Sequence, residues 1–198
     1  MKIYDLSKEV FSAAVFPGDP VAYHQPVLEL AKGDGCNLTA LTLGSHTGTH
    51  MDAPSHFVPG GKTIDQVELS RCVGPCTLVE AQGLLTGEWA EKVLETGVRR
   101  LLIKGEVELS LEAAEELARQ GLYLLGVEGM TVGPLSDPGP VHRALLGAQV
   151  ALLESCDLSG VEPGRYFLAA QPLKLEGLDG APVRALLLQE EEEKEESL

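Results

Sequence analysis

The sequence is poor in aromatic residues and positive charge, and it has no long hydrophobic run. Aromatic side chains make up 5% of the 198 residues, and only one of them is a tryptophan. No stretch approaches the roughly 18 consecutive apolar residues that a membrane-spanning helix needs, so we expect no contact with a membrane. Hydrophobic residues still make up 44% of the chain, which is enough for one domain to bury a substantial core.

Cysteine is also scarce, with four residues that form no repeated pattern of close pairs. The chain has no apolar leader segment behind a basic start. Both features predict a reduced, cytoplasmic protein. Cys72 and Cys76 could form a redox pair or a soft-metal site, but without a second pair we expect them to be small buried residues.

Basic residues are outnumbered by acidic ones, 15 to 30, which gives a formal net charge of -15. Such a surface repels phosphate backbones, so we expect no nucleic-acid partner. Six glutamates and one lysine fall in residues 190–198. We interpret that segment as an acidic, disordered tail, which leaves residues 1–189 as a single domain.

The order of the apolar segments predicts an α/β fold with a mixed, partly parallel sheet. Apolar runs of strand length occur at 75–81, 99–106, 122–129, 150–158 and 165–175. Helical patterns lie between them at 86–97, 110–121 and, more weakly, 140–146. The first 75 residues have short alternating pieces separated by turn residues, which indicates β structure. Strands that alternate with helices favour a single α/β domain.

The densest group of reactive side chains lies in GSHTGTHMDAPSHF, residues 44–57. Three of the five histidines of the chain fall here, together with an aspartate. If the segment continues as extended chain, its two-residue period places His46, His50 and Asp52 on one side. Two imidazoles and a carboxylate form a mixed nitrogen and oxygen ligand set, which suits Zn(II), Mn(II) or Fe(II).

The small residues of this segment favour a site over a plain strand. Gly48 leaves space for an ion between the histidines, and Pro54 ends regular pairing so that His56 can fold back over it. The alternative is a turn held by histidine and threonine hydrogen bonds. Three neighbouring imidazoles would then each need a separate partner, so we favour the metal site.

The two remaining histidines differ from each other. His24 has no acidic or histidine neighbour, and we assign it to loop structure. His142 opens a possible helix and precedes Glu154 by 12 residues. Because Glu154 ends an apolar strand, its carboxylate needs a partner in the interior.

The segment HTGTHMDAPSHF resembles the signature of the metal-dependent cyclase-type hydrolases, a family that includes bacterial kynurenine formamidases and isatin hydrolases. The resemblance begins at YDLS (residues 4–7) and FPGDP (residues 16–20). It continues through HRALLG to LLESCDLSGVEPGRYFLAAQPLKLEGLDGAPVRALL. The step from His142 to Glu154 also resembles the second pair of metal ligands of the family.

The resemblance implies a fold, a metal centre and an assembly. It implies five ligands for two divalent metals: His46 and His50 on the first, Asp52 and Glu154 as bridges, and His142 on the second. His56 would stay off the metals as the proton donor and acceptor. Zinc is implied by the formamidases and manganese by the isatin enzymes. The fold would be a swivelling β/β/α domain, usually in a homodimer whose subunits help to close each other's pocket.

Two positions depart from the family pattern and concern the substrate. In the kynurenine formamidase subgroup a tryptophan before PGD packs on the aromatic substrate, whereas this chain has Phe16, which offers less stacking area. Glu128 stands where many relatives carry an aspartate, and the sequence assigns it no role. Neither change touches the predicted metal ligands.

These residues together predict metal-assisted hydrolysis of an aryl formamide, with N-formylkynurenine of tryptophan catabolism as the small aromatic substrate. A divalent metal acidifies a water ligand and stabilises charge on a carbonyl oxygen, and His56 would protonate the leaving amine. One alternative is a hydrolase of a cyclic amide or lactone, as in the isatin hydrolases. The other is a non-catalytic protein that binds a metal or ligand, but such a protein has no use for an uncoordinated His56.

Overall fold

A nine-stranded mixed sheet forms the centre of the molecule, for which a computed structural model describes residues 1–190. In spatial order its strands are β1 (Lys2–Asp5), β13 (Leu186–Gln189), β11 (Gly164–Ala169), β5 (Val73–Glu80), β7 (Arg100–Lys104), β9 (Leu124–Val127), β10 (Ala151–Glu154), β4 (His50–Asp52) and β12 (Gly180–Pro182). The four strands β5, β7, β9 and β10 are parallel, and antiparallel strands flank them on both sides. The predicted α/β fold with a partly parallel sheet is confirmed.

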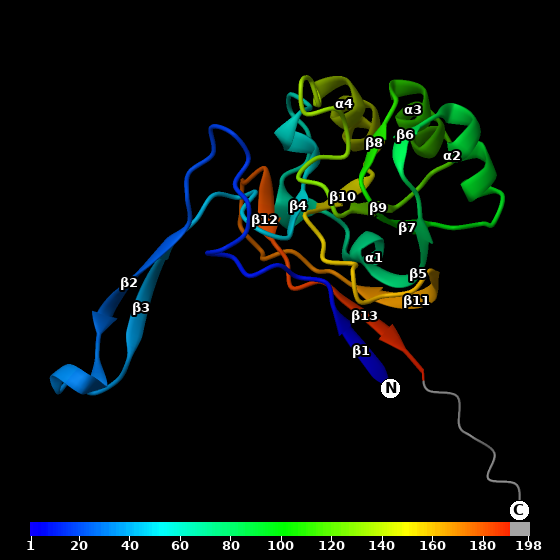
Figure 1. Cartoon of the computed structure of the whole chain (residues 1–198). Helices are drawn as coiled ribbons and strands as arrows, with labels where there is room; N and C mark the ends of the chain where they lie inside the picture. The colour runs from blue at the N-terminus through cyan, green and yellow to red at the C-terminus, as the bar shows by residue number, and fades with distance from the viewer. Residues whose placement is uncertain (191–198) are drawn as a thin grey trace, which may run out of the picture.

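Of the four α-helices within residues 1–190, α2, α3 and α4 lie together over one face of this sheet (Figure 1). The helices are α1 (Leu69–Cys72), α2 (Gly87–Leu94), α3 (Leu111–Arg119) and α4 (Gly139–Gly147). The predicted caps are present, because the Thr86 hydroxyl accepts from Trp89 N at 3.4 Å and the Ser110 hydroxyl accepts from Ala113 N at 3.2 Å. All three predicted helices are confirmed, within the uncertainty of helix ends.

The sheet has a hydrophobic core on each of its faces. Leu101 and Ile103 of β7 pack among the helices, whereas Leu102 between them packs in the cluster on the opposite face. The same alternation separates Leu125 from Leu124 in β9. Strands buried on both faces are apolar at nearly every position, which explains the continuous runs in the sequence.

The sheet curls, so that its first strand approaches the strands at its other side. Ser7, just after β1, forms an isolated antiparallel bridge with Cys156, just after β10. Val183 N, just after β12, donates to Thr49 O at 2.9 Å. The curl closes the sheet around the end of β10, where Glu154 lies.

A two-stranded arm extends away from the body of the molecule (Figure 1). It consists of β2 (Tyr23–Leu28) and β3 (Leu38–Thr42), joined through the 3₁₀ turn η1 (Leu30–Lys32). Every residue of the two strands is exposed. A second small sheet pairs β6 (Gly83–Leu85) with β8 (Val107–Leu109) beside the helices.

The histidine segment does not form one continuous strand, so that part of the prediction is wrong. The chain turns at residues 45–48, where Thr47 N donates to Gly44 O and Gly48 takes a φ of +65°. Only His50–Asp52 is strand, and the 3₁₀ turn η2 (Pro54–His56) follows almost at once. A glycine tolerates this left-handed conformation without steric cost, which a period-two reading of the sequence overlooks.

Within residues 1–190, no helix is long and apolar enough to cross a membrane. The remaining short helix, η3 (Ile64–Gln66), leads into α1. The acidic tail predicted at 190–198 lies outside the described residues from position 191 onward.

Candidate metal centre

Strand β4 carries two of the predicted ligands into the interior of the sheet. Its register sets His50 directly beside Glu154 of β10. Because side chains alternate along a strand, Asp52 points to the same face as these two. All three are buried, with at most 3% of each residue exposed. Ionisable groups at this depth need partners, and here they are partners for one another.

Helix α4 adds His142 to this group, so residues 12 positions apart in the chain meet as predicted. His142 Nε2 lies 3.2 Å from Glu154 Oε1 and 3.5 Å from Asp52 Oδ2. On the other side, His50 Nε2 lies 3.4 Å from Asp52 Oδ1 and 3.4 Å from Glu154 Oε2. Two imidazoles and two carboxylates therefore converge on one small volume.

Backbone carbonyls define the tautomer of both imidazoles. His50 Nδ1 lies 2.9 Å from Gly48 O, and His142 Nδ1 lies 2.8 Å from Pro138 O. A carbonyl oxygen only accepts, so each Nδ1 carries the proton and donates it. In the neutral rings this leaves the Nε2 lone pairs directed at the carboxylates, as metal ligands require.

One buried oxygen of this group has no hydrogen bond. Asp52 Oδ2 is inaccessible to solvent and unsatisfied, and its neighbour His142 Nε2, at 3.5 Å, is too distant for a hydrogen bond. A buried carboxylate oxygen without a partner is costly unless a cation binds it. The donor set therefore fits a divalent metal.

The pKa values of these groups show how strongly they interact when no metal is bound. Burial alone would lower the pKa of His50, but hydrogen bonds and charges from Asp52 and Glu154 raise it to about 10. Burial likewise opposes the charge of His142, but the nearby carboxylates of Asp52 and Glu154 raise its pKa to about 10. Burial opposes ionisation of Asp52, yet the surrounding histidines hold its pKa well below the usual range. The metal-free centre is thus a cluster of buried ion pairs.

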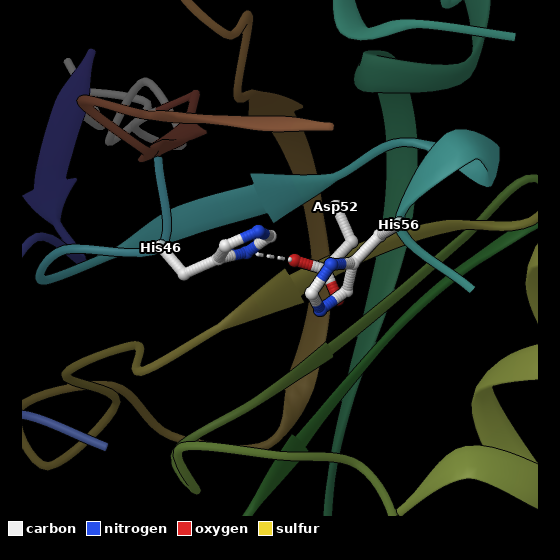
Figure 2. A group of neighbouring side chains, drawn as sticks. All are labelled: His46, Asp52 and His56. Carbon is white, nitrogen blue, oxygen red and sulfur yellow. Dashed lines mark hydrogen bonds and ion pairs between the residues drawn. The ribbon is translucent and has the colours of Figure 1, made fainter. Parts of the chain in front are cut away.

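His46 and His56 approach the same aspartate from the other side (Figure 2). His46 Nδ1 lies 2.8 Å from Asp52 Oδ1. The rings of His46 and His56 stack, with centroids 4.0 Å apart and planes inclined by 30°. The turn η2, which begins at Pro54, brings His56 back over the segment as the sequence analysis expected.

By distance alone, His56 could also reach a metal. Ligand atoms of His46, Asp52 and His56 lie within 4.8 Å of one another, and so do those of His50, Asp52 and Glu154. His56 differs from the others in its environment, since burial lowers its pKa while His50 and His142 have raised values. The predicted role of His56 in proton transfer stays a prediction.

A cavity of about 170 Å³ opens onto the centre. Its walls include four of the histidines (His46, His50, His56 and His142) and Glu154. Phe16 lines it too, at the position predicted to contact an aromatic substrate. Phe57 forms a second aromatic wall, with its ring centroid 4.5 Å from that of His142. No pattern in the sequence pointed to Phe57, although it directly follows the predicted His56.

The other predicted residues lie away from this cavity. His24 lies in strand β2 of the exposed arm, so its assignment to a loop is wrong, and its ring contacts Phe11. Cys72 and Cys76 are buried, and burial raises the pKa of their thiols to about 11 and about 12. Both therefore behave as the small buried residues that the sequence analysis expected.

Glu128 receives a structural role that the sequence did not assign. Its carboxylate accepts from Gly105 N at 2.7 Å and from Leu158 N at 3.0 Å. It thus connects the turn after β7 to the loop after β10. Glu128, one of the two departures from the family pattern, does not line the cavity.

Residues 4–134 match the family model described as putative cyclase, which is more than half of the chain. The chain belongs to the cyclase family. Curated relatives of this cyclase-family chain include the kynurenine formamidase of Salinibacter ruber, which is 36% identical over 94% of this chain and 97% of the relative. The kynurenine formamidase of Delftia acidovorans is 33% identical over 94% of this chain and 97% of that relative.

Solved structures support the same cyclase-family fold. A protein described as a potential metal-dependent hydrolase with cyclase activity is 28% identical, with a TM-score of 0.81 over 96% of this chain and 98% of that one. Isatin hydrolase A from Labrenzia aggregata, bound to benzyl benzoate, has a TM-score of 0.79 over 96% of this chain and 94% of that one. At 21% identity the latter shows a shared fold alone. The predicted family fold is confirmed.

Proposed function

We propose that this cyclase-family protein is a metal-dependent hydrolase that cleaves an aryl formamide, converting N-formylkynurenine to kynurenine and formate. The observation that carries the proposal is the convergence of His50, Asp52, Glu154 and His142 around a cavity that has aromatic walls. Relatives named kynurenine formamidases, similar over nearly their whole length, support the choice of bond. The activity belongs to a single domain of residues 1–189.

We propose that the centre binds two divalent metal ions, with zinc as the first candidate and manganese as the alternative. The donors would be His46, His50, Asp52, His142 and Glu154. Their mixed nitrogen and oxygen chemistry and the unsatisfied Asp52 oxygen support this assignment. Bound divalent ions acidify a water molecule and stabilise negative charge on a carbonyl oxygen.

His56 is the residue that we assign to proton transfer. Because burial lowers its pKa from 6.5, its ring is neutral at pH 7 and can accept a proton from the attacking water. The oxygen of that water bonds to the formyl carbon. As the carbon–nitrogen bond breaks, His56 returns the proton to the nitrogen of the aryl amine, and the formyl group departs as formate.

Phe16 and Phe57 are the residues that we assign to the aromatic part of the substrate. Both rings line the cavity, so an aryl group can pack on either of them. A phenylalanine at position 16 provides stacking but less contact area than a larger aromatic residue would. The pocket therefore suits a single aromatic ring with a small amide substituent.

The direct test uses purified protein, with its metal content measured by mass spectrometry. We expect zinc-loaded protein to release kynurenine and formate from N-formylkynurenine, chelation to abolish turnover, and zinc or manganese to restore it. Formate is measured by coupled formate dehydrogenase, and kynurenine by its absorbance. Rates equal to those of free metal ions in buffer would contradict the proposal.

The second candidate is hydrolysis of a cyclic amide or lactone. The structural similarity to isatin hydrolases supports this second candidate, because the same centre could open a cyclic carbonyl compound. A panel of N-formylkynurenine, formylanilines, isatin and lactones separates the two candidates. The substrate with the highest kcat/KM identifies the reaction.

We also propose that the protein is a cytoplasmic homodimer that the β2–β3 arm helps to assemble. An isolated two-stranded hairpin is at best marginally stable in water, so an arm of this kind needs a partner surface. Its exposed apolar side chains include Tyr23, Val27 and Leu41, each more than half exposed. The absence of disulfides among residues 1–190 is consistent with a reducing compartment.

A further inference from the structure

Asp179 contacts both of the histidines that lie on one side of the centre. Its Oδ2 is 3.0 Å from His46 Nε2 and 3.3 Å from His56 Nδ1. Nothing in the sequence pattern singled it out, because it lies more than 120 residues downstream in the chain, just before β12. One carboxylate oxygen therefore faces a predicted metal ligand and the predicted proton carrier at once.

The backbone around Asp179 is held in place by strand pairing. Asp179 O accepts from Ala53 N at 2.9 Å, and the next residue, Gly180, lies opposite Asp52 in the pairing of β12 with β4. The lack of a side chain at Gly180 is needed here, since a Cβ would lie 2.7 Å from His46 Cε1. The start of β12 thus supports the His46 ring by its shape as well as by the carboxylate.

Asp179 is not among the residues that line the cavity. Its carboxylate is partly exposed and approaches the His46 and His56 rings, which Figure 2 shows beside Asp52. We therefore expect the effect of Asp179 on the reaction to act through His46 and His56, the rings that its carboxylate contacts.

We propose that Asp179 is a positioning residue that fixes the ring orientation and tautomer of His46 and His56. This inference rests on the proposed function for its effect on catalysis, but its effect on metal binding does not depend on the substrate. Neither the sequence pattern nor the names of the relatives assign a role to the Asp179 carboxylate.

The chemistry follows from which nitrogen faces the carboxylate. His46 lies between two carboxylates, with Nδ1 2.8 Å from Asp52 Oδ1 and Nε2 3.0 Å from Asp179 Oδ2; a metal would displace the proton from Nδ1, while Asp179 would keep the proton on Nε2. His56 Nδ1 lies 3.3 Å from the same oxygen, so the carboxylate favours a proton on Nδ1 and leaves Nε2 to exchange a proton with the substrate. Outer carboxylates of this kind orient a histidine ligand and raise its basicity.

The experiment compares Asp179→Asn and Asp179→Ala with Glu176→Gln, a control that removes an exposed carboxylate three residues away. Zinc affinity is measured by competition with a chelating dye, and the ring nitrogens are observed by ¹⁵N NMR of the zinc-loaded protein. We expect Asp179→Ala to weaken zinc binding by about 10- to 100-fold and to change the ring-nitrogen signals of His46 and His56. Asp179→Asn should show a smaller effect, because its amide oxygen still accepts.

Turnover adds a third measurement for the same variants. We expect kcat to fall while KM stays near the wild-type value, since Asp179 does not line the cavity. Asp179→Glu, which restores a carboxylate, should recover part of the zinc affinity. Wild-type zinc affinity together with unchanged ring-nitrogen signals in Asp179→Ala would overturn the inference. If zinc binding and spectra respond but no formamide is hydrolysed, the proposed function fails and the positioning role stands.

Discussion

At the scale of single residues, protons and metal ions compete for the same histidine nitrogens of the metal centre. His50 and His142 have pKa values raised to about 10 when no metal is bound, because Asp52 and Glu154 favour their charged forms. The resulting ion pairs stabilise the metal-free fold fully below pH 6.5, and this contribution declines as the pH rises through about 10. A metal ion must displace these protons. Metal binding is therefore favoured as the pH rises, whereas the ion pairs of the metal-free fold are favoured as the pH falls.

We therefore expect the filling of both metal sites at pH 7 to release at least two protons, one each from His50 and His142. His46 adds a further contribution, because burial opposes its charge but Asp52 and Asp179 raise its pKa overall. Calorimetric titration at pH 7 in two buffers of different ionisation enthalpy measures the number of protons. The affinity should fall steadily as the pH drops from 9, with zinc lost well before pH 4. Equal apparent enthalpies in both buffers would contradict this prediction. His24→Ala, which alters a histidine of the exposed arm, should release the same number as the wild type.

The two stacked histidines give a second prediction at this scale. His46→Ala should lose zinc as well as activity, because it removes a proposed ligand. His56→Ala should retain zinc and lose about 10²- to 10⁴-fold in kcat, the usual contribution of a general acid or base. Zinc content and turnover are measured on the same preparations. Equal zinc loss in both variants would place His56 among the ligands.

At the scale of elements, short segments deliver the functional side chains while long ones provide support. Strand β4 has only three residues, yet it lies between β10 and β12 and so places His50 and Asp52 beside Glu154. The turn η2 is equally short and carries His56. Its shape depends on Gly61, where a Cβ would lie 2.7 Å from the carbonyl carbon of Pro54.

Gly61→Ala should consequently displace η2 and with it His56. We expect kcat to fall by about 10-fold or more, since small displacements of a catalytic group are costly, while zinc binding changes less. Gly160→Ala is the matched control, because a Cβ there meets nothing within 4 Å. Crystal structures or NMR spectra of both variants report the position of η2. Full activity in Gly61→Ala would show that the turn tolerates the added methyl group.

At the scale of the whole molecule, the arm is the feature that a single subunit leaves unexplained. The chain between Tyr23 and Thr42 exposes apolar side chains on a hairpin that no other element of the described structure covers. The arm is the segment through which we propose that two subunits pair, because its apolar side chains have no cover within the described residues.

Light scattering after size-exclusion chromatography tests this proposal. The wild type should have the mass of a dimer, and Leu41→Asp should shift it toward the monomer, because a charge buried at an interface is strongly destabilising. Leu69→Asp is the control, since both leucines are 61% exposed but Leu69 lies on the body. A wild type that has monomer mass at all concentrations, or a dimer that Leu41→Asp leaves intact, would contradict the role of the arm.

Much of this protein is determined locally in its sequence. The helices α2 and α3 could be placed because Thr86 and Ser110 cap them and a single apolar face follows, and the parallel strands because burial on both faces makes them continuously apolar. The histidine segment could be recognised because His46, His50, Asp52 and His56 lie within 11 residues. Interactions over a few residues are visible in the order of the residues themselves.

Other features exist only because distant segments meet. The turn at Gly48 was missed, since a period of two cannot reveal a single positive φ. The register of β4 between β10 and β12 decides that Glu154 and Asp52 share a face, and pairing across more than 100 residues leaves no local pattern. Asp179 enters the site for the same reason. The sequence determined which chemistry this chain carries, and the tertiary structure decided which atoms face one another, because a contact depends on distance in space and not along the chain.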